Sequence, residues 1–166
     1  IIGGNLWLKM GRRNIINAID LSSLGLDKIE EDEGGFRIGC MATLHDIETH
    51  EGLNKEFQNL FKEAVRHIVG VQFRNCATIG GSIFPKLGFS DVLTAFLACD
   101  TQVILYKKGE VPLREFIYIP TDNDILTHLY VKKDGRKTAY ESFRMTETDF
   151  PTITCAMAKT QDGFET

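Results

Sequence analysis

The order of the helices and strands that the sequence predicts is the feature that most limits the fold. Apolar residues recur at helical spacing from Leu53 to Val69, which predicts an amphipathic helix. Shorter helices are predicted at 43–51 and 91–99. Strands are predicted on both sides of this helical stretch, at 1–2, 17–21, 26–31, 36–39, 101–107, 124–132, 137–144 and 152–159. Elements grouped in this way, rather than alternating as repeated βαβ units, indicate an α+β fold.

Local signals predict where several elements begin and end. Thr43 and Ser90 are suited to cap the N-termini of the two shorter helices, because hydroxyl side chains accept hydrogen bonds from free helical amides. Gly70 is expected to end the long helix. A turn at 33–35 predicts a hairpin of the strands 26–31 and 36–39, and the turn Asp134-Gly135 separates 124–132 from 137–144. The segment 6–10 is expected to begin a helix, 73–83 to be a loop, and 111–116 to be a strand or a short helix.

Composition excludes several classes of function. The chain has 166 residues, a net charge of −4 and a pI near 5.6, which argues against a nucleic-acid-binding protein. The longest apolar stretch, 92–99, is far shorter than the ~20 residues that span a bilayer, and no signal peptide is visible. We therefore expect a cytoplasmic protein without membrane contact. The ends, IIGG and GFET, lead us to expect an incomplete version of a longer polypeptide.

The cysteines and histidines do not predict a metal site. No two cysteines form a CxxC pair, and zinc and iron–sulfur sites need clustered thiolates. The four histidines are too widely spaced for a zinc helix. No motif of a nucleophile with its base is present, so no catalytic side chain is predicted. The four cysteines are Cys40, Cys76, Cys99 and Cys155.

Two glycine pairs are the best candidates for a binding site. Gly3-Gly4 follows the apolar pair Ile1-Ile2, and Gly80-Gly81 lies between Thr78 and Ser82. Glycine allows the backbone to approach a ligand closely, and successive backbone N–H groups can form a nest for an anion. These features suit a diphosphate, although glycine pairs are also common in ordinary tight turns. Neither pair matches GxGxxG, so a Rossmann site is not predicted.

The sequence around the second pair resembles a known family. The string VQFRNCATIGGSI, residues 71–83, resembles the signature of the FAD-binding middle subunit or domain of xanthine dehydrogenase-type molybdenum hydroxylases. In that family the segment reads roughly Gln-Val-Arg-Asn-x-Ala-Thr-Ile-Gly-Gly-Asn. IIGGN at 1–5 is similar to the family's Ala-Gly-Gly-Thr-Asp loop, and IGCMATL at 38–44 is similar to Ile-Gly-Ala-x-Thr-Thr-Leu. The resemblance covers nearly the whole chain.

The resemblance implies a fold and a cofactor. The fold would be the two-subdomain α+β flavin fold of the vanillyl-alcohol oxidase/MurB (PCMH) type, incomplete at both ends. Residues 1–150 would form the FAD-binding domain without its usual lead-in, and 151–166 would begin a truncated C-terminal subdomain. FAD would lie between the subdomains, with its pyrophosphate held by bare amides of two loops that converge from opposite walls of a cleft. The implied residues are Ile2, Gly3, Gly4, Asn5 and Leu6 in the first loop, and Thr78, Ile79, Gly80, Gly81 and Ser82 in the second.

Two further residues and three departures complete the expected site. Asp91 would accept hydrogen bonds from the ribose, or it is simply a carboxylate in the first turn of a helix. Leu126 would pack on the side of the flavin, or it is a core residue. Ser82 stands where the family usually has Asn, and Leu6 and Trp7 stand where Asp and an aliphatic residue are common.

The family also implies a role in electron transfer. A molybdopterin-binding large subunit would oxidise a purine or another N-heterocycle, and a 2Fe-2S small subunit would carry the electrons to FAD, which would reduce NAD. Two alternatives stay open. The chain could be a flavin-free scaffold subunit of such a complex, or a stand-alone flavoprotein of the same fold.

Overall fold

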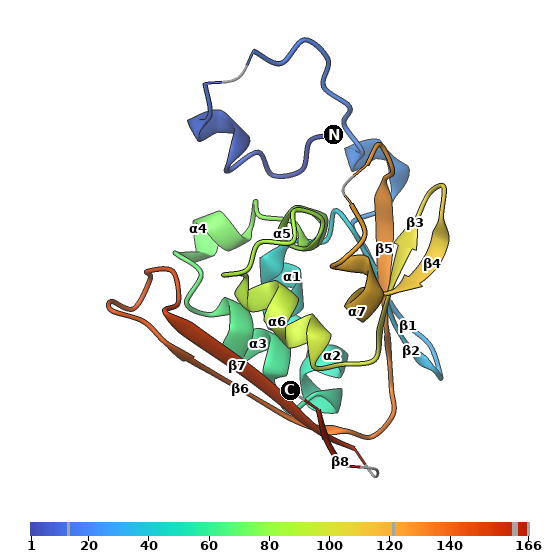
Figure 1. Ribbon diagram of the computed structural model, residues 1–166, viewed down its shortest axis with the longest axis vertical. Coiled ribbons are helices and arrows are strands. Elements are labelled where there is room, and N and C mark those ends of the chain that lie inside the picture. Colours follow the sequence, from blue (N-terminus) through green and yellow to red (C-terminus); the bar gives the residue numbers. More distant parts are fainter. Residues whose placement is uncertain (13, 121, 161–162, 166) are drawn as a thin grey trace.

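The computed structural model describes residues 1–12, 14–120, 122–160 and 163–165, and it places a layer of helices between two antiparallel sheets (Figure 1). The larger sheet has the strand order β1-β2-β5-β3-β4, and the smaller has the order β6-β7-β8. The strands of the larger sheet are β1 Ile29–Glu31, β2 Gly35–Gly39, β3 Thr101–Leu105, β4 Gly109–Pro112 and β5 Leu126–Lys132. Those of the smaller are β6 Lys137–Phe143, β7 Ile153–Thr160 and β8 Gly163–Glu165. The predicted α+β class is therefore observed.

Short helices make up the central layer. They are α1 Leu44–Thr49, α2 Glu51–Glu56, α3 Leu60–Val65, α4 Val71–Arg74, α5 Ile79–Ile83 and α6 Asp91–Leu97. A further helix, α7 Leu113–Phe116, directly follows β4, and two 3₁₀ turns, η1 Leu8–Met10 and η2 Ser22–Leu24, lie in the N-terminal segment. Within the described residues, no helix is long and apolar enough to cross a membrane.

A row of aromatic rings runs from the larger sheet into the helical layer and forms much of the core. The ring of Phe36 on β2 lies 6.1 Å from that of Phe57, which lies 5.4 Å from Phe61 on α3. Phe61 in turn lies 4.5 Å from Phe96 on α6. All four side chains are buried. Because these rings interlock in tilted and edge-to-face contacts, they fix the helices against the sheet.

The helix predicted over 53–69 is wrong in its length. The chain forms α2 and α3 with a break between them, where Gln58 and Asn59 have φ of 45° and 64°. These left-handed conformations are incompatible with a continuous helix. Gly70 does not end a helix but precedes α4 as its N-cap.

The loop predicted over 73–83 is also wrong, because this segment contains the end of α4 and the whole of α5. Thr78 caps α5 by accepting a hydrogen bond from the amide of Gly81. Two consecutive glycines weaken a helix, which is why the sequence alone does not predict one there.

Two predictions about strands need correction. The strand predicted at 17–21 is only an isolated parallel bridge between Ile2 and Asp20. The strands predicted at 124–132 and 137–144 exist as β5 and β6, but they belong to different sheets. The turn at Gly135, with φ of 69°, is therefore where the chain crosses from one sheet to the other.

The segment 111–116 is divided between the end of β4 and α7. The domain boundary expected after residue 150 falls in the connection between β6 and β7.

Candidate functional site

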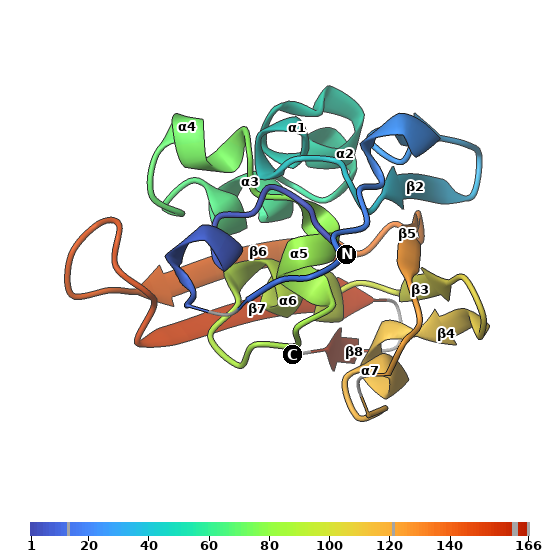
Figure 2. The same cartoon turned by 90° about the horizontal axis from the view of Figure 1, so that it is seen from above.

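The structure brings the two predicted glycine loops into direct contact. A Cβ atom placed on Gly4 would lie 1.6 Å from the carbonyl oxygen of Cys76, and one on Gly3 would lie 2.7 Å from Oγ1 of Thr78. Real Cβ atoms do not approach other atoms this closely, so the first loop fits against the second only because it lacks side chains there. The N-terminus accordingly lies over α5 (Figure 1, Figure 2).

The first loop presents free backbone donors. The amide of Ile2 donates to the carbonyl of Ile19 at 2.8 Å. In the described part of the chain, the amides of Gly3, Gly4 and Asn5 donate to no acceptor. Asn5 adopts the left-handed conformation with φ of 58°. Consecutive free N–H groups beside a left-handed residue are the arrangement of an anion nest.

The second loop is different, because its amides have acceptors within the protein. Ile79 donates to Ala42 at 2.9 Å, and Gly80 donates to Cys40 at 2.7 Å. Gly81 donates to Oγ1 of Thr78 at 3.2 Å. The expectation of bare amides is therefore wrong for both glycines of this pair. The segment between β2 and α1 supplies a carbonyl to Gly80, and the side chain of Thr78 accepts from Gly81.

Gly80 and Gly81 consequently have different surroundings. A Cβ on Gly80 would lie 2.9 Å from both Cβ and the carbonyl oxygen of Cys40, whereas Gly81 is exposed. The hydroxyl of Ser82 donates to the carbonyl of Thr78 at 3.0 Å. Gly80 thus serves close packing, and Gly81 is the residue of this pair that faces outward.

Asp91 is placed in a buried ion pair. Its carboxylate accepts hydrogen bonds from the hydroxyl of Tyr140 and the guanidinium of Arg144, both on or next to β6. Its residue exposure is 5%. Burial raises the pKa of the Asp91 carboxyl above its ordinary value, against the opposing effects of Tyr140 and Arg144. Burial, and after it the hydrogen bond to Asp91, raises the pKa of Tyr140.

Leu126 is also buried, with an exposure of 4%. It is the first residue of β5 and pairs with Leu105 in the register of β3. The carbonyl of the next residue, Thr127, accepts a hydrogen bond from the amide of Cys40 at 2.8 Å. Leu126 thus lies in the core behind the second loop, while Ile2 and Leu6 are half-buried in the first.

A family described as the FAD binding domain in molybdopterin dehydrogenase matches residues 1–131, which include both glycine loops. The chain belongs to this family. The expected resemblance and the expected cofactor, FAD, are therefore confirmed at the level of the family.

Individual relatives agree with this assignment. The chain is 27% identical over 147 residues to the Escherichia coli protein YgfM, covering 88% of this chain and 55% of that protein. It is 34% identical over 90 residues to the aldehyde oxidoreductase FAD-binding subunit PaoB of E. coli, covering 52% of this chain and 28% of that subunit. The chain thus spans about half the length of YgfM and less of PaoB.

A solved structure shows the fold. The carbon monoxide dehydrogenase from Hydrogenophaga pseudoflava matches with a TM-score of 0.76 at 21% identity, over 98% of this chain and 61% of that chain. The expected PCMH-type α+β fold is therefore confirmed.

The first loop of this FAD-binding domain fits a pyrophosphate. The three amides at Gly3, Gly4 and Asn5 have no acceptor among the described residues, and negative oxygens are what such a nest binds. Gly81 adds an exposed residue beside the N-terminal end of α5. No group of His, Cys, Asp or Glu that could hold a metal is found where the structure is described.

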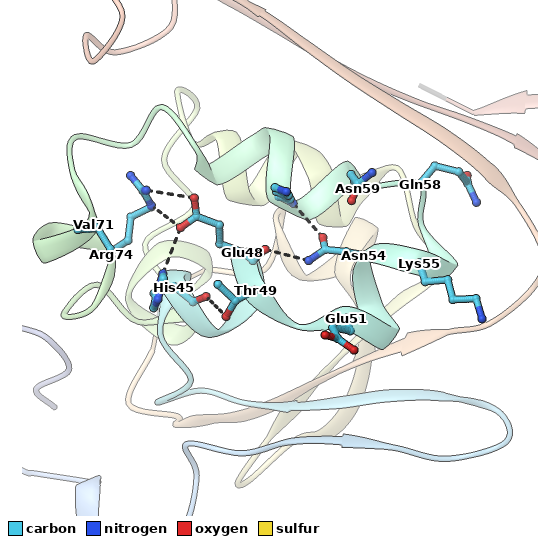
Figure 3. Close-up of a pocket in the computed structure, with 11 residues that line it drawn as sticks. His45, Glu48, Thr49, Glu51, Asn54, Lys55, Gln58, Asn59, Val71 and Arg74 are labelled. Atoms are coloured by element: carbon cyan, nitrogen blue, oxygen red, sulfur yellow. Dashed lines mark hydrogen bonds and ion pairs between the residues drawn. The ribbon is translucent and has the colours of Figure 1, made fainter.

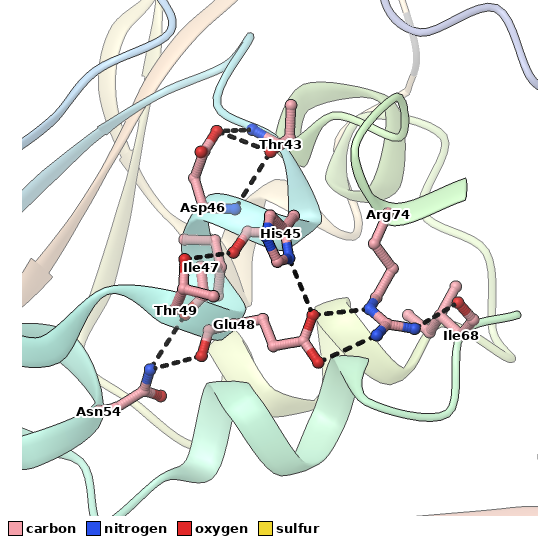
Figure 4. Close-up of polar contacts among 9 residues, drawn as sticks. All are labelled: Thr43, His45, Asp46, Ile47, Glu48, Thr49, Asn54, Ile68 and Arg74. Atoms are coloured by element: carbon pink, nitrogen blue, oxygen red, sulfur yellow. Dashed lines mark hydrogen bonds and ion pairs between the residues drawn. The ribbon is translucent and has the colours of Figure 1, made fainter. Parts of the chain in front are cut away.

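A separate groove of about 770 Å³ lies on the helical layer (Figure 3). It is lined by residues of α1, α2, α3 and α4 together with the turn between α2 and α3, and Arg74 and Glu48 are central to its polar wall. The Arg74 guanidinium donates to both carboxylate oxygens of Glu48, at 2.8 and 3.1 Å, and to the carbonyl of Ile68 (Figure 4). Burial alone would raise the pKa of Glu48, but the hydrogen bonds from Arg74 and His45 outweigh it and lower the pKa.

This network braces the FAD-binding domain rather than offering free ligand groups. The side chain of Asn54 donates to the carbonyls of Ile47 and Glu48, and its oxygen accepts from the amide of Lys62. Arg74 is four residues before Thr78, so its ion pair with Glu48 fixes α4 and the start of the second loop onto α1.

An aromatic cluster that the sequence does not predict lies beside the first loop. It consists of Trp7, Phe89 and Phe150, in which the ring of Phe150 contacts both of the others. One signal was available, since Trp7 is the single tryptophan of the chain and follows the glycine pair closely. The contacts themselves join residues that are far apart in the sequence.

Proposed function

We propose that this chain holds FAD by its pyrophosphate on the amides of Gly3, Gly4 and Asn5, with Ile2 and Leu6 flanking them. The residues Thr78, Ile79, Gly80, Gly81 and Ser82 form the supporting wall. The observation that carries the proposal is the row of three amides without an acceptor in the described chain, held against the second loop. A negative diphosphate would give these donors the partners that the protein does not supply.

The roles expected of Asp91 and Leu126 change in this proposal. Both side chains are buried, and the Asp91 carboxylate is bound by Tyr140 and Arg144. We infer that Asp91 supports the site through these two contacts, and that Leu126 supports the second loop from the core.

We further propose that the protein is the FAD-binding electron-transfer subunit of a molybdenum hydroxylase of the xanthine dehydrogenase type. FAD, when bound, would supply the redox chemistry, and the protein would supply position and electrostatics. The proposed partners are a molybdopterin-binding large subunit and a 2Fe-2S small subunit, with NAD as the electron acceptor. The family description and the name of PaoB, an FAD-binding subunit, support the general role. The names of the relatives point to aldehydes and carbon monoxide as substrates of such complexes.

In that scheme the residues of this chain bind and orient FAD and take no part in the redox step. The nest of the first loop would orient the dinucleotide through its diphosphate, and the close packing of Gly4 on Cys76 would keep the nest rigid. No side chain of the two loops is placed to move a proton, because Thr78 and Ser82 are hydrogen-bonded within the loop.

A flavin-free scaffold subunit is the second candidate. The observation that favours it is the internal pairing of the amides of Ile79, Gly80 and Gly81, which leaves the first loop as the main source of free donors.

The substitution Gly4→Ala tests the FAD proposal. Its Cβ would meet the Cys76 carbonyl at 1.6 Å, so the two loops must separate and the nest must lose its shape. We expect FAD affinity, measured by titration of flavin fluorescence, to fall by at least about tenfold. Gly70→Ala is the matched control, because its Cβ would meet only the flexible end of Gln72 at 3.1 Å.

Wild-type protein should be yellow after reconstitution with FAD. Protein that folds but takes up no flavin would support the scaffold instead. Reduction of the bound flavin by NADH would support NAD as the acceptor, and co-purification with the two partner subunits would test the assembly.

A further inference from the structure

The aromatic cluster of Trp7, Phe89 and Phe150 joins three distant segments of the chain. The rings of Trp7 and Phe150 are stacked, with centroids 5.9 Å apart and an angle of 22° between their planes. The ring of Phe89 meets Phe150 edge-on at 4.9 Å. Trp7 directly follows the first glycine loop, Phe89 directly precedes the cap of α6, and Phe150 lies in the β6–β7 connection.

The cluster is exposed although its rings pack on one another. Trp7 is 53% exposed, Phe89 41% and Phe150 61%. Contiguous exposed apolar surface usually marks a binding site. Phe150 stacks on the Trp7 indole, and because more than half of Trp7 is nevertheless exposed, the indole keeps surface on which a flat ligand can stack.

The position of Phe150 is fixed by the ion pair of Asp91. Arg144 donates to the Asp91 carboxylate and, through Nη1, to the carbonyl of Asp149 at 2.7 Å. Asp149 directly precedes Phe150. The β6–β7 connection is therefore held to the N-terminus of α6, which is also where Phe89 is attached.

The location beside the nest identifies the class of ligand. Trp7 is two residues after Asn5, whose amide belongs to the nest. The indole is therefore attached to the chain next to the residues that would bind the diphosphate. The groups attached to that diphosphate in FAD both end in planar heteroaromatic rings. Such rings stack on exposed aromatic side chains.

We propose that Trp7, backed by Phe150 and Phe89, is the stacking platform for a planar heteroaromatic ring of the bound dinucleotide, and that Asp91 and Arg144 position Phe150 for this purpose. The proposal rests on the FAD site proposed above and adds a specificity-determining residue to it. The ring is either the adenine or the isoalloxazine, and truncated ligands distinguish them.

The experiment measures the affinity of the full chain for FAD in wild type, Trp7→Ala, Trp7→Phe and Tyr118→Ala. We expect Trp7→Ala to weaken FAD binding by at least about fivefold, and Trp7→Phe to restore most of the loss because a ring is again present. Tyr118 is an exposed aromatic residue outside the cluster, so its replacement should leave the affinity unchanged.

The single tryptophan also locates the ring. In wild type, titration with ADP should change the emission of Trp7 if the adenine stacks there, and titration with FMN should do so if the isoalloxazine does. Equal FAD affinity in wild type and Trp7→Ala would overturn this inference while leaving the pyrophosphate site intact. Failure of Trp7→Phe to restore binding would also overturn it. Wild-type protein that binds no FAD would instead overturn the proposed function, and this inference with it.

Discussion

Cys40 connects the larger sheet to the second glycine loop through its backbone. Its amide donates to the carbonyl of Thr127 on β5 at 2.8 Å, and its carbonyl accepts from Gly80 at 2.7 Å. The side chain is buried against Gly80. Burial in this position raises the pKa of the Cys40 thiol from 9.0 to about 11, because a thiolate is poorly solvated there.

The raised pKa predicts a loss of stability in alkali. The folded state holds the thiol proton more tightly than the unfolded state, so the contribution of Cys40 is fully present below about pH 9 and is lost as the pH rises to about 11. Within this window the free energy of unfolding should fall by up to about 1.4 kcal/mol per pH unit. Urea unfolding at several pH values should show a shallower slope in Cys40→Ala and an unchanged slope in Cys155→Ala, whose side chain is exposed. An identical slope in all three proteins would contradict the assignment to Cys40.

The glycine pairs could be found from the sequence because their signal is local. The partners of Asp91 could not, because Tyr140 and Arg144 are 49 and 53 residues away along the chain. A carboxylate in the first turn of a helix is equally suited to a ligand and to an ion pair. Only the approach of Tyr140 and Arg144 to the start of α6 in the folded chain decides between them.

The same division between local and distant causes holds for the helices. The caps at Thr43 and Ser90 were predicted correctly, because each hydroxyl accepts from an amide three residues ahead, and Thr43 forms a complete capping box with Asp46. The break between α2 and α3 was not predicted. At this break the side chain of Gln58 accepts a hydrogen bond from the amide of Thr138, which is 80 residues later in the chain.

The left-handed residue at the break allows a matched pair of substitutions. Asn59 has φ of 64°, and its side chain makes no capping hydrogen bond to α3. We infer that asparagine suits this position because it adopts the left-handed conformation more readily than most residues. Asn59→Ala should lower the free energy of unfolding by about 1 kcal/mol, whereas Asn59→Gly should be nearly neutral because glycine adopts positive φ without strain. Thermal or urea unfolding of the two variants measures the difference. Equal losses in both would show that the amide side chain, and not the backbone, matters here.

The arrangement of the two sheets follows from contacts that no local pattern encodes. β5 and β6 are consecutive, yet β5 pairs with β2 and β3 from earlier in the chain, whereas β6 pairs with β7, the next strand, in a separate sheet. The smaller sheet contributes the buried Ala156 and Ala158 to the core. Polar contacts also attach it to the helices, since Thr138 binds the α2–α3 turn and Arg144 and Tyr140 bind Asp91. The alternation of exposed and buried residues on β6 and β7 predicts that they are strands, but it does not identify the helices that they cover.

The attachment of the smaller sheet can be tested at Arg144. Arg144→Met leaves the Asp91 carboxylate buried with Tyr140 as its remaining side-chain partner, and loss of one member of a buried pair typically costs about 3–5 kcal/mol. Hydrogen exchange should become faster in β6 and β7, while the larger sheet keeps its protection. Lys132→Met is the matched control, because the ion pair of Lys132 with Asp100 is largely exposed and such pairs contribute about 0–1 kcal/mol. If Arg144→Met instead accelerates exchange equally in both sheets, the two sheets unfold as one unit and the Asp91–Arg144 pair is not a local anchor.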